Sequence, residues 1–368
     1  MMNEIQMVDL RSQYQDLKSD VDQAIQNVID EGKFINGPAV QRFASDLQDW
    51  NRSKFVIPCA NGTDGLQLAM MALGLKAGDE VIVPAFTYIA TVEVIVLLGL
   101  TPIFVDVDYQ SFNLDPQKVK DVITENTKLI VPVHLYGQCA NMDEINNIAK
   151  ANDLFVIEDL AQSLGAQYKG VKCGNIGDIG VTSFFPSKNL GCFGDGGAVI
   201  TNNPELANRI KMIGNHGQKQ KYYHEIIGVN SRLDSLQAAI LIEKLKKLNE
   251  FENRRRQAAD YYDQNLKDLS FIDIPFRELD STHVFHQYTL KVRDGRRDAL
   301  SDHLKNHRIP NMIYYPLPVP EQSAYSRFNK RKYSTSKKLC EEVISLPMHT
   351  HLSDEQLSFI CKTIKKFG

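Results

Sequence analysis

The sequence predicts an α/β fold in which a larger domain holds a mostly parallel sheet flanked by helices, followed by a smaller α+β domain. Two observations carry this prediction. From residue 54 onward, short β-branched runs alternate with helical patterns, and such strand–helix repeats are typical of parallel sheets. The strand runs are also almost continuously apolar, as expected of strands that are buried on both faces.

The elements of the larger domain follow one another in this alternating order. The expected strands are residues 54–59, 79–84, 101–108, 128–136, 154–159, 178–185 and 196–202. The expected helices are residues 64–75, 88–99, 115–124 and 142–153.

The pattern changes after the last of these strands. A long helical stretch with room for a break is expected at 228–266, then a strand at 283–292 and helices at 297–307 and 353–367. A chain of 368 residues is long enough for two domains. We expect the domains at 1–245 and 246–368.

Composition and charge exclude several classes of protein. The net charge of −3 argues against nucleic acid as the main partner, because phosphate binding needs a concentrated basic face. The most apolar run, 89–105, is interrupted by Glu93 and is too short to span a membrane. No apolar segment of a signal peptide stands near the first residue. We therefore expect a cytoplasmic protein that binds neither membrane nor nucleic acid.

The cysteines and two basic clusters are not expected to form binding sites. The six cysteines are widely spaced and form no C-x-x-C pair, so we expect reduced thiols and no metal site. The basic clusters Lys244/Lys246/Lys247 and Arg254/Arg255/Arg256 are expected to form a solvated helix face rather than a binding patch.

Ligands of open parallel sheets bind where the strands end, and the first strand ends in "CANGTDGL". Gly62 and Thr63 precede a helix there, and free amides at a helix amino terminus suit a phosphate. The alternative is an ordinary helix cap by Thr63 or Asp64.

Two more strand ends deliver an aromatic ring and a carboxylate. Tyr88, in "PAFTYIAT", is a candidate to lie on a planar ligand ring, with simple packing at the rim as the alternative. Asp159 ends the strand "LFVIED". A buried carboxylate needs a cation or a hydrogen-bond donor, which a protonated ring nitrogen supplies; the alternative is a helix cap.

The stretch "SFFPSKNLGCFGDGG" supplies a hydroxyl and an amine. Ser183 and Lys188 stand five residues apart on an irregular segment. A lone lysine is ordinarily a surface residue, but a lysine in a partly dry site has a lowered pKa and acts as nucleophile or base. A phosphate cradle, an aromatic ring, a carboxylate and a lysine on one sheet edge are what pyridoxal 5'-phosphate requires.

The chain resembles the DegT/StrS family of pyridoxal-phosphate sugar aminotransferases over nearly its whole length. The resemblance rests on the ordered pieces "GPAV", "CANGTDGL", "PAFTYIAT", "VPVHLYGQ", "IEDLAQSLGA", "SFFPSKNLGCFGDGGA", "NHG", "GVNSRLDSLQAAIL" and "SLPMH". It implies the fold type I of pyridoxal-phosphate enzymes. Lys188 is then the lysine that binds the cofactor covalently, Asp159 pairs with its pyridine nitrogen, Gln162 lies near its phenolic oxygen, and Tyr88 stacks on its ring.

The resemblance also implies a shared site. The cofactor phosphate is expected to contact Gly62, Thr63 and Ser183, and Asn230 is expected to reach the phosphate in the neighbouring subunit. The expected assembly is therefore a homodimer with shared active sites.

Within the family, the segment around "GVNSRLD" is most similar to enzymes that aminate UDP-2-acetamido-2-deoxy-3-oxo-glucuronate for bacterial surface polysaccharide such as O-antigen. Arg232 is a candidate to bind a carboxylate, since its fork suits bidentate pairing; an ion pair with Asp234 is the alternative. Tyr314 and Tyr315 lie near the sugar in the family, where a histidine–tyrosine pair is expected for that branch. Because of this departure, a dTDP-linked 3-keto-6-deoxyhexose or a 4-keto sugar remains an alternative acceptor.

The expected reaction has two halves. L-glutamate gives its amino group to the cofactor, the nucleotide-linked keto sugar then receives it, and Lys188 moves the protons. The alternative from another class is a cofactor-binding regulator without turnover, against which the intact set of Lys188, Asp159 and Gln162 argues.

Overall fold

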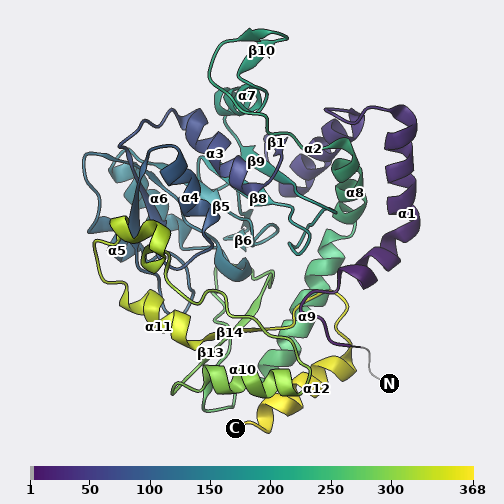
Figure 1. The fold of residues 1–368 in the computed structure, drawn as a ribbon, viewed down its shortest axis with the longest axis vertical. Helices are drawn as coiled ribbons and strands as arrows, with labels where there is room; N and C mark the ends of the chain where they lie inside the picture. Colours follow the sequence, from purple (N-terminus) through teal and green to yellow (C-terminus); the bar gives the residue numbers. More distant parts are fainter. Residues whose placement is uncertain (1–3) are drawn as a thin grey trace.

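The computed structural model describes residues 4–368, and within them the chain folds around a seven-stranded sheet (Figure 1). The strands lie in the order β1 (Phe55–Cys59), β9 (Gly197–Thr201), β8 (Ile179–Ser183), β5 (Phe155–Asp159), β4 (Thr127–Ile130), β2 (Glu80–Pro84) and β3 (Thr101–Val105). β9 pairs antiparallel with β1 and β8, whereas the other neighbours are parallel. The expected mostly parallel sheet is thus confirmed.

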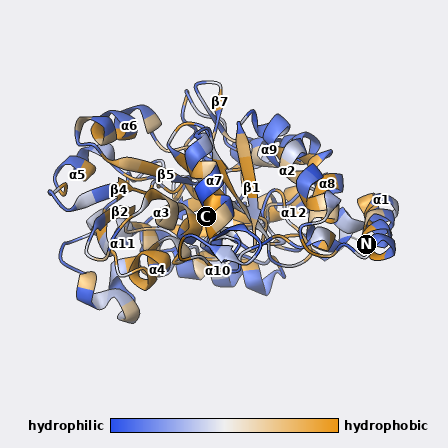
Figure 2. Cartoon of the chain, turned by 90° about the horizontal axis from the view of Figure 1, so that it is seen from above, coloured by the Kyte–Doolittle hydropathy of each residue, from blue (hydrophilic) through white to orange (hydrophobic). Residues whose placement is uncertain are grey.

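Helices cover both faces of this sheet, and Figure 2 shows the apolar strands enclosed between them. One face carries α3 (Gly62–Leu73), α4 (Ala90–Leu97) and α7 (Pro204–Ile213). The other carries α2 (Pro38–Asn51), α5 (Pro116–Lys120), α6 (Met142–Ala151) and α8 (Ser235–Leu245). Burial on both faces explains why the strands read as unbroken apolar runs.

The first helices of the chain were not predicted. α1 (Leu10–Glu31) buries Leu17, Val21 and Val28 on one stripe, and Leu17 and Val21 pack against Ile240 of α8. The remaining surface of α1 is largely polar, so its signal is a narrow stripe rather than an apolar run.

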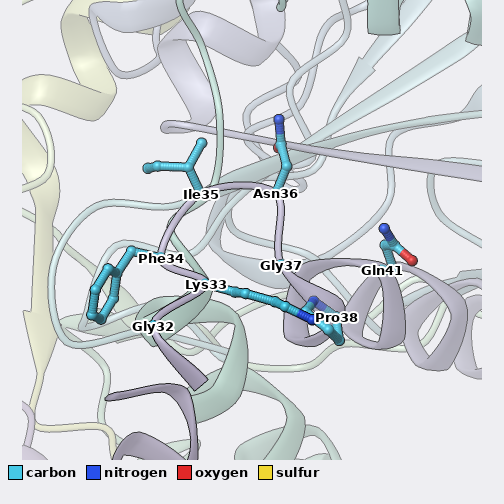
Figure 3. Close-up of a pocket in the computed structure, with 8 residues that line it drawn as sticks. All are labelled: Gly32, Lys33, Phe34, Ile35, Asn36, Gly37, Pro38 and Gln41. Atoms are coloured by element: carbon cyan, nitrogen blue, oxygen red, sulfur yellow. The ribbon is translucent and has the colours of Figure 1, made fainter. Parts of the chain in front are cut away.

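The loop between α1 and α2 lines a pocket at the surface (Figure 3). A Cβ on Gly37 would lie 2.4 Å from the carbonyl oxygen of Lys33, which only glycine avoids. The Gly37 amide donates to Ser235 Oγ over 3.2 Å, and Pro38 opens α2. The motif "GPAV" therefore fixes the start of α2 against α8.

A smaller three-stranded antiparallel sheet, with the strand order β12-β13-β14, follows the larger part. The part of the chain that holds this sheet consists of α9 (Leu248–Leu266), β12 (Ile272–Asp273), β13 (Tyr288–Val292), α10 (Arg297–Asn306), α11 (Ser334–Glu342), β14 (Val343–Leu346) and α12 (Asp354–Lys365). Ile5 packs into the core of this part, so the first described residues lie with the end of the chain. The domain boundary near residue 245 stays a prediction.

Short elements complete the fold. They are the hairpin strands β6 (Gln167–Tyr168), β7 (Val171–Lys172), β10 (Gln218–Gln220) and β11 (Tyr223–His224), and the 3₁₀ helices η1 (Leu135–Gly137), η2 (Val319–Glu321) and η3 (Ser323–Phe328). The β10–β11 hairpin projects from the body of the molecule beyond α7 (Figure 1). Across residues 4–368, no helix is both long and apolar enough to cross a membrane.

The expectation of a solvated basic face on the long helical stretch is wrong for two residues. Lys244 and Arg255 are buried, with 2% and 3% of their surface exposed. Arg255 donates to the carbonyls of Phe285 and Met348. Both residues are adjacent in sequence to exposed basic residues. Consecutive positions of a helix point in different directions, however, and the packing of the helix decides which of them faces inward.

Candidate active site

A cavity of about 590 Å³ opens at the edge of the sheet where the parallel strands end. It is lined by most of the predicted site residues, namely Gly62, Thr63, Tyr88, Asp159, Gln162, Ser183, Lys188 and Tyr315. Residues from β1, β2, β5 and β8 are thus brought to one place by the sheet order, as expected for an open α/β sheet.

The helix α3 points its amino terminus at this cavity. Its cap is Asn61, whose Oδ1 accepts from the Asp64 amide over 2.8 Å, so the alternative of capping by Thr63 or Asp64 is wrong. The amides of Gly62 and Thr63 have no recorded partner among residues 4–368. Such first-turn amides, with the helix dipole behind them, form an anion site.

Gly62 is required by a close contact between α3 and the end of β8. A Cβ at this position would lie 2.8 Å from Cβ of Ser183, which is closer than side chains approach. Ser183 Oγ accepts from the Phe185 amide over 3.3 Å, and its hydroxyl hydrogen is free to donate. The two residues therefore place amides and a hydroxyl on the same corner of the cavity.

Asp159 is oriented by a residue that the sequence reasoning missed. Thr91, which is buried in α4, donates its hydroxyl to Asp159 Oδ2 over 2.7 Å. Asp159 Oδ1 accepts from the Ala161 amide over 3.1 Å, but no helix begins there, so the alternative of a helix cap is wrong. The carboxylate lines the cavity together with Lys188, so a cationic group of a ligand bound there can pair with it.

The orientation of the Gln162 amide is fixed from both ends. Its Oε1 accepts from the Tyr136 amide over 2.8 Å, and its Nε2 donates to Tyr315 Oη over 3.1 Å. Burial raises the pKa of the Tyr315 phenol, so this hydroxyl stays protonated and can donate to a ligand. Gln162 and Tyr315 thus form a polar wall of the cavity.

Aromatic rings pack beside Tyr315. Tyr88 is about half exposed, and its ring centroid lies 6.1 Å from that of Tyr315. Phe86 packs edge-on against the Tyr315 ring, with 6.1 Å between the ring centroids. Its exposure at the cavity makes Tyr88 a candidate to contact a planar ligand.

Lys188 lies on the irregular segment after β8, where its amide donates to the Phe185 carbonyl over 2.8 Å. Burial lowers the pKa of its amine to about 8, although the charge of Asp159 opposes this shift. The amine is therefore partly neutral near physiological pH and able to attack a carbonyl carbon.

This shift predicts how a bound aldehyde cofactor forms its bond. Below about pH 8 Lys188 carries a proton and has no free lone pair, whereas above it the amine is neutral. We expect the rate of covalent uptake of pyridoxal phosphate by the apoprotein to rise with pH through about 8 and then level off. Absorbance followed after mixing at a series of pH values measures this rate. A rate that keeps rising toward pH 10 contradicts the lowered pKa.

Three of the predicted residues do not line this cavity. Asn230 is exposed at the base of the β10–β11 hairpin, where it bridges to Asn215. Arg232 lines a separate groove of about 450 Å³. Among the described residues it has no recorded ion pair, with Asp234 or any other carboxylate. Tyr314 contributes its backbone carbonyl to a hydrogen bond from the Tyr136 hydroxyl.

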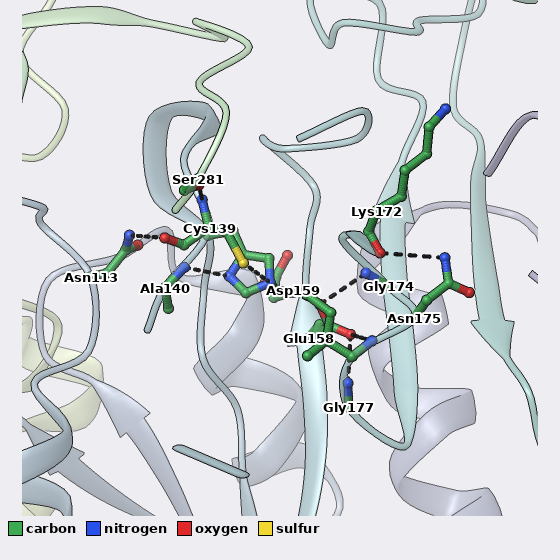
Figure 4. Close-up of polar contacts among 12 residues, drawn as sticks. Asn113, Cys139, Ala140, Glu158, Asp159, Lys172, Gly174, Asn175, Gly177 and Ser281 are labelled. Carbon is green, nitrogen blue, oxygen red and sulfur yellow. Dashed lines mark hydrogen bonds and ion pairs between the residues drawn. The ribbon is translucent and has the colours of Figure 1, made fainter. Parts of the chain in front are cut away.

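A second cluster, of buried polar groups next to Asp159, was also missed (Figure 4). His134, Cys139 and Cys173 place ligand-type atoms within 4.8 Å of one another. His134 Nδ1 accepts from the Ala140 amide over 3.2 Å, so its proton sits on Nε2 and donates to Glu158, 3.0 Å away. The ring therefore has no lone pair left for a metal.

Glu158 is satisfied within the same network. It accepts from the amides of Gly174, Ile176 and Gly177 at 2.8–2.9 Å (Figure 4). Burial alone raises the pKa of this carboxyl, but these bonds and the His134 bond hold it below its ordinary value. The network is a buried support beneath the end of β5, on the side opposite Asp159.

A sequence profile of the DegT/DnrJ/EryC1/StrS aminotransferase family matches residues 15–365. The chain belongs to this family. It is 46% identical over 360 residues to "UDP-2-acetamido-2-deoxy-3-oxo-D-glucuronate aminotransferase" of Pseudomonas aeruginosa, and the match covers 98% of this chain and 99% of that protein.

Two solved structures superpose closely on this chain. Streptomyces venezuelae DesV, solved in complex with a ketimine intermediate, superposes with a TM-score of 0.96 at 37% identity and covers 100% of this chain and 99% of that one. NtdA from Bacillus subtilis, with bound cofactor PMP, gives 0.94 at 31% identity and covers 100% and 86%. The chain is thus a pyridoxal-phosphate aminotransferase of this family.

The residues present fit the family's cofactor. The orphan amides of Gly62 and Thr63 suit its phosphate, Asp159 suits a protonated pyridine nitrogen, and Lys188 supplies the amine for the covalent link. When bound, pyridoxal phosphate supplies an electron sink for the substrate carbon from which a proton is removed.

Proposed function

We propose that this protein transfers the amino group of L-glutamate to a 3-keto nucleotide sugar, with UDP-2-acetamido-2-deoxy-3-oxo-D-glucuronate as the preferred acceptor. The observation that carries the proposal is Lys188, an amine of lowered pKa in one cavity with Asp159 and the α3 amides. The full-length match to the Pseudomonas aeruginosa enzyme supports the choice of sugar. The proposal includes a cytoplasmic setting and a role in surface polysaccharide synthesis such as that of O-antigen.

The chain's own residues have defined tasks in this reaction. Gly62, Thr63 and Ser183 hold the phosphate, and Asp159 keeps a positive charge on the pyridine nitrogen. Lys188, once released from the cofactor, removes a proton from the amino-acid carbon and returns one to the sugar carbon. Both half-reactions use the same amine, which predicts ping-pong kinetics.

The sugar end of the site is proposed to lie near Tyr314 and Tyr315. The Tyr315 hydroxyl stays protonated and is held by Gln162, so it is suited to donate to a sugar oxygen. Arg232 is proposed to bind a carboxylate, of glutamate or of the uronic acid, because its guanidinium makes no ion pair with any other residue of 4–368.

A homodimer with shared sites is part of the proposal. Asn230 and Arg232 lie outside their own chain's cavity, so their proposed roles require a second copy. The projecting hairpin also exposes Tyr222 and Ile227, with 78% and 85% of their surface accessible, and exposed large apolar groups mark association surfaces.

Subunit mixing tests the shared site. Lys188→Ala and Asn230→Ala are expected to be inactive or weak alone. Mixed dimers carry both substitutions in one site and none in the other, so we expect about a quarter of wild-type activity after random exchange. The control mixes each variant with itself. Mixtures no more active than the separate variants contradict shared sites.

The choice of sugar is tested with a panel of nucleotide-linked keto sugars and glutamate, with the product's regiochemistry read by NMR. Preferred amination of UDP-2-acetamido-2-deoxy-3-oxo-glucuronate at carbon 3 supports the proposal. Preference for a dTDP-linked 3-keto-6-deoxyhexose or a 4-keto sugar contradicts the proposed acceptor but is consistent with the proposed amino transfer. A loaded protein whose visible absorbance is unchanged by glutamate overturns the donor half.

A further inference from the structure

The buried lysine of α8 contacts the backbone that carries the reactive lysine. Lys244 Nζ donates to the carbonyl oxygen of Gly191, three residues after Lys188. Its exposed fraction is only 2%. A buried ammonium group is costly unless it is hydrogen-bonded or paired with a charge. The hydrogen bond that Lys244 makes is to the segment that carries Lys188.

The segment from 184 to 194, termed the lysine loop here, is folded tightly on itself. The amide and Sγ of Cys192 both donate to the Phe184 carbonyl, over 2.8 and 3.0 Å. A Cβ on Gly191 would lie 2.3 Å from the carbonyl oxygen of Pro186. The two arms of the loop are thus in contact, and a shift of Gly191 is transmitted to the turn that holds Lys188.

α8 contacts the lysine loop at a second point, about two helical turns before Lys244. Gln237 Oε1 accepts from the Phe193 amide over 2.8 Å. The Phe193 ring centroid lies 5.5 Å from Lys244 Nζ, within the range of a cation–π contact. Two side chains of one rigid helix therefore hold the returning arm of the loop.

Removing either contact has a defined physical consequence. Without Lys244 the Gly191 carbonyl is left buried without its donor, and without Gln237 the Phe193 amide loses its acceptor. Either change favours a looser loop that admits water to Lys188. Because burial is what lowers the Lys188 pKa, added water raises it toward the ordinary value of a lysine.

We propose that Lys244, together with Gln237, is a positioning residue for Lys188, which it holds in place through the Gly191 carbonyl. The inference rests on the proposed role of Lys188 as the cofactor-binding lysine. It assigns a function to a residue that lies outside the cavity and touches neither cofactor nor substrate.

The test compares Lys244→Met, Lys244→Arg and Gln237→Leu with Lys246→Met. Lys246 is exposed on the same helix end and pairs with Glu243, so it is the matched control. The first readout is the pH profile of Lys188 labelling in the apoprotein by a small amine-reactive reagent, quantified by peptide mass spectrometry. The second is the pH dependence of the loaded protein's visible absorbance without substrates.

We expect Lys244→Met to raise the midpoint of the labelling profile by about half a unit or more, and Gln237→Leu to raise it less. Lys244→Arg keeps the donor and is expected to restore most of the wild-type profile. In turnover, kcat falls about tenfold in Lys244→Met while KM stays within about twofold, since a positioning defect is felt in the reacting geometry.

The outcomes separate the possibilities. A lower melting temperature in Lys244→Met with an unchanged labelling profile makes the residue merely structural and overturns the proposal. An equal shift in Lys246→Met also overturns it, and if Lys244→Met does not fold, Gln237→Leu decides alone. Wild-type protein without a cofactor absorbance band refutes the role of Lys188 itself, which is a different failure from an unshifted variant.

Discussion

Replacing Lys188 by alanine removes amino transfer but not cofactor binding. We expect turnover to fall by about 10⁴-fold or more, because the same amine supplies the covalent link and the proton transfers. The phosphate site proposed at Gly62, Thr63 and Ser183 does not include this side chain. Steady-state assays with glutamate and the keto sugar measure the loss, and equilibrium dialysis measures the bound pyridoxal phosphate.

Lys188→Arg is the matched control, because it keeps the charge but not an amine able to form the link. It is expected to be as inactive as the alanine variant. Added methylamine is expected to restore a small part of the activity of Lys188→Ala alone, since it replaces the lost amine in the space created. Normal turnover by Lys188→Ala refutes its assignment as the catalytic residue.

We expect Asp159→Asn to lower kcat by about 10²- to 10³-fold, because a neutral amide does not stabilise a proton on the pyridine nitrogen, as we propose for Asp159. Asparagine has nearly the same shape: its oxygen can still accept from the Ala161 amide, and its NH2 group can donate to the Thr91 hydroxyl, which reverses the direction of that hydrogen bond. The fold is expected to be unchanged by circular dichroism. The measurement is kcat for each half-reaction, together with the absorbance spectrum of the bound cofactor.

Thr91→Val separates charge from orientation. It removes the hydroxyl that donates to Asp159 Oδ2 but leaves the carboxylate in place. We expect a loss of about tenfold, the lower end of the range for one hydrogen bond to a charged group. If Asp159→Asn keeps activity within a few-fold of wild type, Asp159 is not the partner of the pyridine nitrogen.

The two predicted catalytic effects and the proposed role of Lys244 concern the same short segment. Lys188 is held on one side by the sheet, through β8, and on the other by α8. α8 follows directly after Asn230 and Arg232, which are proposed to reach the neighbouring subunit. One helix therefore joins the reactive lysine of one site to the residues proposed for the other.

The strands of the sheet and most residues that line the cavity were predictable from the sequence alone. Apolar β-branched runs are local signals, and the strands they predict all formed, with helices between them. Because parallel strands end at one edge, the sequence alone predicts that residues far apart in the chain, such as Gly62, Asp159 and Lys188, line one cavity.

Only the tertiary structure decided the partners of these residues. That Thr91 orients Asp159, that Lys244 is buried on the lysine loop, and that Arg232 lies outside its own cavity depend on which helix face packs inward. A sequence pattern gives the period of a helix but not its neighbour, so contacts between distant segments are fixed by packing alone.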